Sequence, residues 1–175
     1  MKVFINPGHA PNGIPDPGAV NPTSGRRECD IVYKIAGKVK EYLTSMRIMS
    51  EVLQSDSLAH IVTSANLSEA DLFVSIHCNA SSLHVARGTE TWYFNNSEIG
   101  RRLAESIHRE IVKSVHGITN RGIKEGNFYV LRNTDMPAVL VETAFIDNPH
   151  DEDLLLKYSD EFARAIAAGI FNAAI

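Results

Sequence analysis

Short apolar segments alternate with longer amphipathic segments along this chain. The segments at residues 72–76 and 138–142 are apolar without alternation, which is typical of strands buried on both faces. The pattern predicts an α/β domain with a mainly parallel, twisted sheet of about six strands and helices on both faces. The predicted strands are residues 3–6, 47–53, 72–76, 89–94, 128–131 and 138–142.

The longer segments carry apolar residues at helical spacing. Ile31, Ile35, Val39 and Leu43 form one such stripe, and similar stripes occur within residues 58–65, 99–111 and 162–170. We expect each of these helices to bury one face against the sheet. Residues 89–94 alternate in polarity instead, which predicts an edge strand of different direction. Residues 7–25 are rich in Pro and Gly and have no periodicity, so we expect a long ordered loop there.

Composition narrows the class of protein. A chain of 175 residues that is 44% hydrophobic suits one domain, residues 1–175, with a single sizeable core. The net charge of -4 and the lack of a Lys/Arg block exclude nucleic acid as the main partner. Two cysteines are too few for a disulfide framework. The N-terminal segment has neither a charged leader nor a long apolar stretch, so we expect no signal peptide, no membrane anchor and no membrane partner.

Two histidines and two glutamates stand where an apolar segment ends or a helix begins. His9, His77 and Glu142 close apolar segments, and Glu28 opens the helical stretch that follows the Pro-rich loop. Ligands of open parallel sheets gather outside the carboxyl ends of the strands. Counting back by helical steps from Val39 places Glu28 on the inward face of the first turn. Ionisable groups in such places are costly to bury unless they are paired or bound to a metal.

These four residues predict a catalytic zinc site. Imidazole and carboxylate are common Zn²⁺ ligands, and three protein ligands with an open fourth position are typical of catalytic sites. We expect His9, Glu28 and His77 to be the ligands and Glu142 to be the general base. Taken singly, a strand-end histidine is more often structural, and Glu28 would suit the dipole of a helix N-terminus. The coincidence of all four favours the metal site.

The other polar residues are weaker candidates. His60, His108 and His150 are expected to face solvent, and His84 and His116 lie in or near loops. A substrate groove is expected between the Pro-rich loop and residues 120–127. The side chains that would bind peptide carboxylates or amides there are Asn79, Arg121, Lys124 and Arg132.

At several separate blocks the sequence resembles the zinc-dependent N-acetylmuramoyl-L-alanine amidases of autolysins, cell-division enzymes and phage endolysins. The blocks are INPGH at residues 5–9, DPGA at 16–19, the acid Glu28, ADLFVSIHCNA at 70–80, GTETWYF at 88–94, NRGIKEGNFYVLR at 120–132 and MPAVLVETAFIDNP at 136–149. The resemblance spans nearly the whole chain. It implies the same roles for His9, Glu28, His77 and Glu142, and cleavage of the amide between the muramic lactyl group and L-alanine.

The resemblance also implies a setting. The partner would be peptidoglycan, the location the cell wall, extracellular or periplasmic, and the expected state a monomer. Relatives often carry an Arg in the segment where this chain has VLQSD, residues 52–56, and another in the next helix, where this chain has Ile61. Both positions are expected to lie away from the metal. Two other classes of protein remain open. One is a zinc carboxypeptidase or endopeptidase that acts on wall peptides, and the other is a noncatalytic wall-binding module with structural zinc.

Overall fold

A computed structural model describes residues 1–173 and contains one six-stranded sheet with the strand order β2-β1-β3-β6-β4-β5. β1 pairs in parallel with β2 and β3, and β3 pairs in parallel with β6. β4 runs antiparallel to β6 and parallel to β5. The strands are β1 (Lys2–Pro7), β2 (Met49–Val52), β3 (Leu72–Asn79), β4 (Thr89–Tyr93), β5 (Asn120–Glu125) and β6 (Ala138–Phe145).

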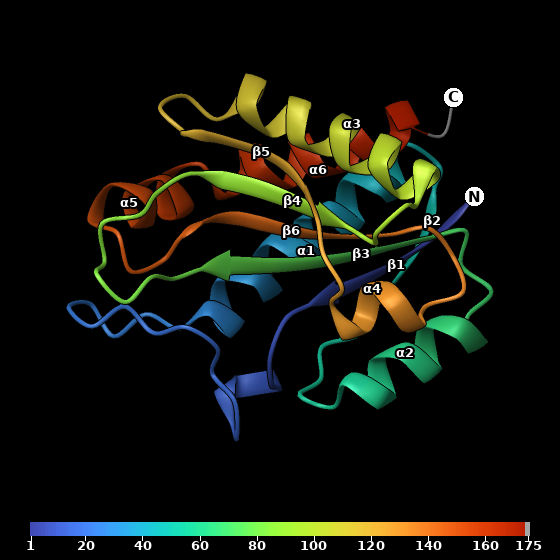
Figure 1. The fold of residues 1–175 in the computed structure, drawn as a ribbon, viewed down its shortest axis with the longest axis horizontal. Helices are drawn as coiled ribbons and strands as arrows, with labels where there is room; N and C mark the ends of the chain where they lie inside the picture. The colour runs from blue at the N-terminus through green and yellow to red at the C-terminus, as the bar shows by residue number, and fades with distance from the viewer. Residues whose placement is uncertain (174–175) are drawn as a thin grey trace.

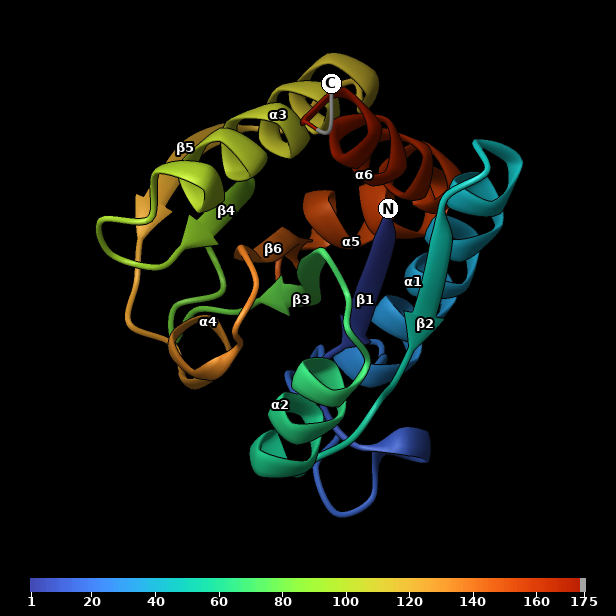
Figure 2. The ribbon, with the colours of Figure 1, turned by 90° about the vertical axis from the view of Figure 1, so that its right-hand side faces the viewer.

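Helices cover both faces of this sheet (Figures 1 and 2). One layer holds α1 (Glu28–Ser45), α3 (Glu98–Ser114) and α6 (Ser159–Ala173), and the other holds α2 (Leu58–Leu67) and α4 (Tyr129–Asn133). α5 (Pro149–Lys157) follows β6 and contacts α6, and the short helix η1 (Pro11–Gly13) lies in the Pro-rich loop. The predicted α/β fold with a mainly parallel sheet is therefore confirmed.

Each helical layer encloses its own apolar core. Ile35, Val74 and Ile107 belong to the larger core, between the sheet and the layer of α1, α3 and α6. Phe4 and Phe73 belong to the smaller core beneath α2 and α4, where their rings stack with centroids 5.9 Å apart. Close packing on both faces makes the central strands a rigid support for side chains at their carboxyl ends. No helix within residues 1–173 has the length and apolar character needed to cross a membrane.

The strand predicted at residues 128–131 is wrong. This segment enters helix α4, which buries Val130 and Leu131 in the smaller core. The sixth strand of the sheet is instead β5. It was not predicted because its residues are exposed or half-buried, so its sequence has no apolar run. β4 has the different direction that was predicted, but its edge position is wrong, since it lies between β6 and β5.

Two smaller expectations also need correction. β2 begins at Met49 rather than at Arg47, whose φ of 60° places it in a turn after α1.

His108 does not face solvent: it is 6% exposed, and its Nε2 lies 2.7 Å from Oδ1 of Asn120. The imidazole thus ties α3 to the start of β5. His60 and His150 are exposed, as predicted.

Candidate metal centre and active site

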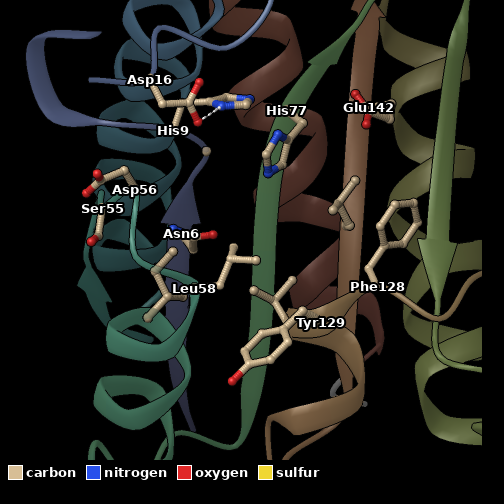
Figure 3. Close-up of a pocket in the computed structure, with 14 residues that line it drawn as sticks. Asn6, His9, Asp16, Ser55, Asp56, Leu58, His77, Phe128, Tyr129 and Glu142 are labelled. Carbon is tan, nitrogen blue, oxygen red and sulfur yellow. Dashed lines mark hydrogen bonds and ion pairs between the residues drawn. The ribbon is translucent and has the colours of Figure 1, made fainter. Parts of the chain in front are cut away.

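Three of the four predicted site residues lie toward the carboxyl ends of central strands, and the fourth begins α1. His9 follows β1 by two residues, while His77 in β3 and Glu142 in β6 are direct partners in the parallel register. Glu28 is the first residue of α1 and is 3% exposed, so it occupies the inward first turn predicted for it. Figure 3 shows His9, His77 and Glu142 along the upper part of one pocket.

The carboxylate of Glu28 joins the two histidines. Its Oε1 lies 2.9 Å from Nδ1 of His77 and accepts a hydrogen bond of 2.9 Å from the backbone N–H of Cys78. Its Oε2 lies 2.9 Å from Nε2 of His9 and accepts a hydrogen bond of 2.8 Å from the backbone N–H of Ala19. Each oxygen therefore has one backbone donor that fixes it and one imidazole that faces it.

This donor set fits a zinc ion. One ligand atom from each of His9, Glu28 and His77 lies within 4.8 Å of the others. Two glycines leave room for them. A Cβ at Gly8 would lie 2.6 Å from Nδ1 of His77, and a Cβ at Gly18 would lie 2.6 Å from Oε2 of Glu28. Two imidazoles and one carboxylate in a close group are a typical zinc ligand set.

Without a metal, His9 and Glu28 form an ion pair. Burial by itself lowers the pKa of His9, but the bonds to Glu28 and Asp16 outweigh it and raise the pKa to about 9. Burial by itself raises the pKa of Glu28, but His77 and His9 outweigh it and lower the pKa to about 2. A bound metal needs the imidazole lone pair, so it must displace the proton of His9.

His9 has a strained backbone that its surroundings hold in place. Its φ of 67° lies in the left-handed region, which costs on the order of 1–3 kcal/mol for most residues other than glycine. Asp16 contacts its side chain, with Oδ2 2.8 Å from Nδ1 of His9. Gln54 holds the neighbouring backbone, because its Nε2 donates to the carbonyl oxygens of Gly8 and Cys29, each at 3.0 Å. Gln54 belongs to the segment 52–56 that was expected to lie away from the metal, and for this residue the expectation is wrong.

Glu142 carries an enclosed carboxylate. Among the residues that the structure describes, its buried Oε2 has no hydrogen-bond partner. Burial raises its pKa to about 7, with Glu28 and Glu90 adding to the rise and His77 and His9 opposing it. A carboxyl with this pKa exchanges its proton readily near neutral pH, as a general acid and base requires.

A pocket of about 350 Å³ runs from this centre along the sheet toward α2 and α4 (Figure 3). One wall is the Pro-rich loop, as predicted, but the opposite wall is the start of α4 rather than residues 120–127. Ile61, on α2, also lines the pocket. The lining residues are Asn6, Gly8, His9, Asp16, Ser55, Asp56, Leu58, Ile61, His77, Phe128, Tyr129, Val130, Leu140 and Glu142.

Three of the four predicted substrate-binding residues meet at a buried acid outside this pocket. Asn79, Arg121 and Lys124 all hydrogen-bond to the carboxylate of Glu90. Arg132 lies apart from them, since its Nη1 donates to Oδ1 of Asn127 and its guanidinium stacks over Tyr129. The sequence did not single out Glu90, although the alternation within TETWY places it on the same face of β4 as Trp92.

Comparison with known proteins places this chain in a family. The family model described as N-acetylmuramoyl-L-alanine amidase matches residues 3–172. The chain belongs to the N-acetylmuramoyl-L-alanine amidase family. A solved member of the family, the amidase from Clostridium difficile 630, is 38% identical and superposes with a TM-score of 0.91, over 99% of this chain and 96% of that one.

Two curated relatives are similar over almost the whole chain. The amidase LytC of Bacillus subtilis is 37% identical over 95% of this chain and 34% of its own length. The endolysin of Bacillus phage SPP1 is 41% identical over 95% of this chain and 62% of its own length. The chain therefore spans between about one third and two thirds of these two proteins.

Proposed function

We propose that this chain is a zinc-dependent N-acetylmuramoyl-L-alanine amidase. Its substrate would be peptidoglycan, cut at the amide between the lactyl group of N-acetylmuramic acid and L-alanine. The observation that carries the proposal is the close group of His9, Glu28 and His77, with the orphaned carboxylate of Glu142 beside it on the next strand. Family membership supplies the substrate class.

His9, Glu28 and His77 are the residues that would hold the zinc ion. The bound ion would supply a Lewis acid that polarises the lactyl carbonyl and acidifies the attacking water. Asp16 orients the ring of His9, and the backbone N–H groups of Ala19 and Cys78 orient the carboxylate of Glu28. These outer contacts hold the ligand atoms in place before the metal arrives.

Glu142 moves the proton. Its Oε2 accepts a proton from the attacking water as the new bond to the lactyl carbonyl carbon forms. The bond from that carbon to the L-alanine nitrogen then breaks, and the protonated Glu142 returns the proton to the departing amine. The products are a free lactyl carboxylate on the glycan and a free α-amino group on the peptide.

The setting follows from the substrate. Peptidoglycan lies outside the cytoplasm, so the enzyme acts in the cell wall, extracellular or periplasmic. We expect it to act as a monomer, since the proposed ligands and base all come from one chain.

Digestion of purified peptidoglycan tests the proposal, with the new chain ends identified by mass spectrometry and amine labelling. The amidase predicts new L-alanine amino termini and lactyl carboxylates, and chelation should abolish their release until zinc is restored. New termini elsewhere in the peptide would instead indicate a carboxypeptidase or endopeptidase.

The Glu142→Gln variant separates an enzyme from a wall-binding module. We expect it to keep stoichiometric zinc by metal analysis and to lose at least about a hundredfold in rate, as expected when a general base is removed. A module with structural zinc would release no product in either form.

A further inference from the structure

Glu90 stands beside the proposed general base. In the antiparallel pair of β4 and β6 it is the direct partner of Glu142, so the two side chains leave the same face of the sheet. Glu90 is only 3% exposed. A second acid, buried and adjacent to the first, needs strong compensation to remain charged.

Four donors provide that compensation. Oε1 of Glu90 accepts hydrogen bonds from Nδ2 of Asn79 at 3.0 Å and from Nε1 of Trp92 at 3.2 Å. Oε2 lies 2.7 Å from Nε of Arg121 and 2.5 Å from Nζ of Lys124. Burial by itself raises the pKa of Glu90, but Lys124 and Arg121 outweigh it and lower the pKa. Both oxygens of Glu90 are therefore fully occupied by protein donors.

The group carries a net positive charge that reaches solvent. Two cations share one carboxylate, and the side chains of Arg121 and Lys124 are 34% and 32% exposed. Arg121 donates to Glu90 through Nε alone. Among the described residues, Nη1 and Nη2 of Arg121 have no hydrogen-bond partner. The guanidinium also stacks over the ring of Phe145, 5.0 Å from the centroid. Arg121 is thus held in one orientation with two parallel donors free, a geometry that matches a carboxylate.

This cationic group adjoins the pocket wall. Nζ of Lys124 lies 5.1 Å from the ring centroid of Trp92, and Trp92 packs edge-on against Phe128, whose side chain lines the pocket. β5 is two strand spacings from β6, about 10 Å. An extended peptide covers this distance in about three residues.

We propose that Arg121, supported by Lys124 and Glu90, binds a carboxylate of the stem peptide close to L-alanine. The proposal rests on the proposed function. In that substrate the lactyl carboxyl is consumed in the scissile amide, so carboxylates near the bond occur only on the peptide side. The peptide therefore runs over β4 and β5, and the glycan lies toward Ser55 and Leu58. The geometry assigns Arg121 to substrate selection, while Glu90 is a positioning residue.

Two muramoyl peptides test this assignment. They differ only in the residue after L-alanine, which bears a free carboxylate in one and a carboxamide in the other. We expect the wild-type enzyme to show a KM about tenfold lower for the carboxylate peptide, the size expected for a charge-assisted hydrogen bond. Arg121→Gln should raise that KM about tenfold with kcat retained, and should leave the KM for the carboxamide peptide unchanged.

Matched variants separate binding from folding. Arg121→Lys keeps the charge opposite Glu90 but lacks the guanidinium fork, so we expect it to fold normally and to lose most of the preference. Arg101→Gln removes a half-buried arginine whose ion pairs among the described residues are with Glu98 and Glu105 on α3, and it should behave as wild type. Inhibition of the wild-type enzyme by the two free product peptides gives a readout that needs no variant, with the carboxylate form expected to inhibit about tenfold more strongly.

Specific outcomes would overturn the assignment. Equal KM values for the two peptides with the wild-type enzyme, or equal losses for both peptides in Arg121→Gln, would show that Arg121 does not read the carboxylate. In both cases the amide is still cleaved, so the proposed function survives. If the wild-type enzyme with zinc cleaves neither peptide and releases no L-alanine termini from peptidoglycan, the proposed function itself fails.

Discussion

The Oδ2 atom of Asp16 lies 2.8 Å from Nδ1 of His9. A carboxylate can only accept a hydrogen bond, so Nδ1 of His9 carries a proton and Nε2 is the nitrogen left to bind a metal. The other oxygen, Oδ1, accepts a hydrogen bond of 2.9 Å from the backbone N–H of Gly18. The loop that carries Asp16 thereby fixes both the tautomer and the orientation of this imidazole.

The Asp16→Ala variant should bind zinc more weakly. Loss of the carboxylate frees the ring of His9 and removes its outer partner, which typically lowers metal affinity about 10–100-fold. Competition with a chromophoric chelator measures the Kd. Asp16→Asn keeps an acceptor oxygen and should fall between the two, so an Asn variant weaker than the Ala variant would contradict this role.

Gln54 should matter more for metal affinity than for folding. Gln54→Met removes the donors to Gly8 and Cys29, the neighbours of two proposed ligands, and we expect zinc affinity to fall about tenfold. The thermal midpoint of the metal-free protein reports folding separately.

Asn66→Asp is the matched control for Gln54. The Nδ2 of Asn66 donates to the carbonyl oxygen of Asn133 at 3.0 Å, a similar amide contact that joins the helices α2 and α4. Its loss should cost about 1 kcal/mol of stability and leave zinc affinity unchanged. If both variants bind zinc equally well, Gln54 has no positioning role.

Gly8→Ala should disable the metal site. The added Cβ would lie 2.6 Å from Nδ1 of His77, so the imidazole must leave its present position. We expect at least a tenfold loss of zinc affinity with the far-ultraviolet circular dichroism spectrum retained. Gly37→Ala in α1 is the control, because a Cβ there meets nothing within 4 Å. In the interior of a helix it should stabilise the protein by about 0.5–1 kcal/mol without an effect on zinc.

The ionisation of Glu142 should make the metal-free protein less stable as pH rises. Its pKa in the folded state, about 7, lies above the ordinary value of 4.5. The folded state therefore holds this proton more tightly than the unfolded state, and stability is lost between about pH 4.5 and pH 7. At about 1.4 kcal/mol per pKa unit, the loss reaches at most about 4 kcal/mol.

Urea unfolding of the chelated proteins at pH 5 and pH 8 measures this effect. Glu142→Gln lacks the titration, so its stability relative to wild type should be higher at pH 8 than at pH 5. His9 and Glu28 titrate in both proteins and largely cancel in the comparison. An equal difference at the two pH values would mean that Glu142 ionises without cost.

Two neighbouring segments illustrate where local pattern is ambiguous. Residues 128–131 form an apolar run too short to distinguish a strand from a helix, and burial of Val130 and Leu131 against the sheet is satisfied by helix α4. Residues 120–125 lack an apolar run, yet they form β5, because backbone hydrogen bonds to β4 define an edge strand without requiring burial. The burial of His108 was also not predictable from its local sequence, because its partner Asn120 is brought to it only by the fold.

The sequence by itself determined the alternation of strands and helices and the placement of His9, Glu28, His77 and Glu142 at segment ends, because periodicity and segment ends are local properties. Only the tertiary structure decided which groups meet. Local periodicity does not encode strand order or register. These place Glu90 opposite Glu142 and bring Arg121 to the carboxylate of Glu90. They also bring Gln54 to the backbone of Gly8 and Cys29. The sequence thus indicated which residues form the site, whereas the contacts that position these residues depend on how the strands are arranged in the sheet.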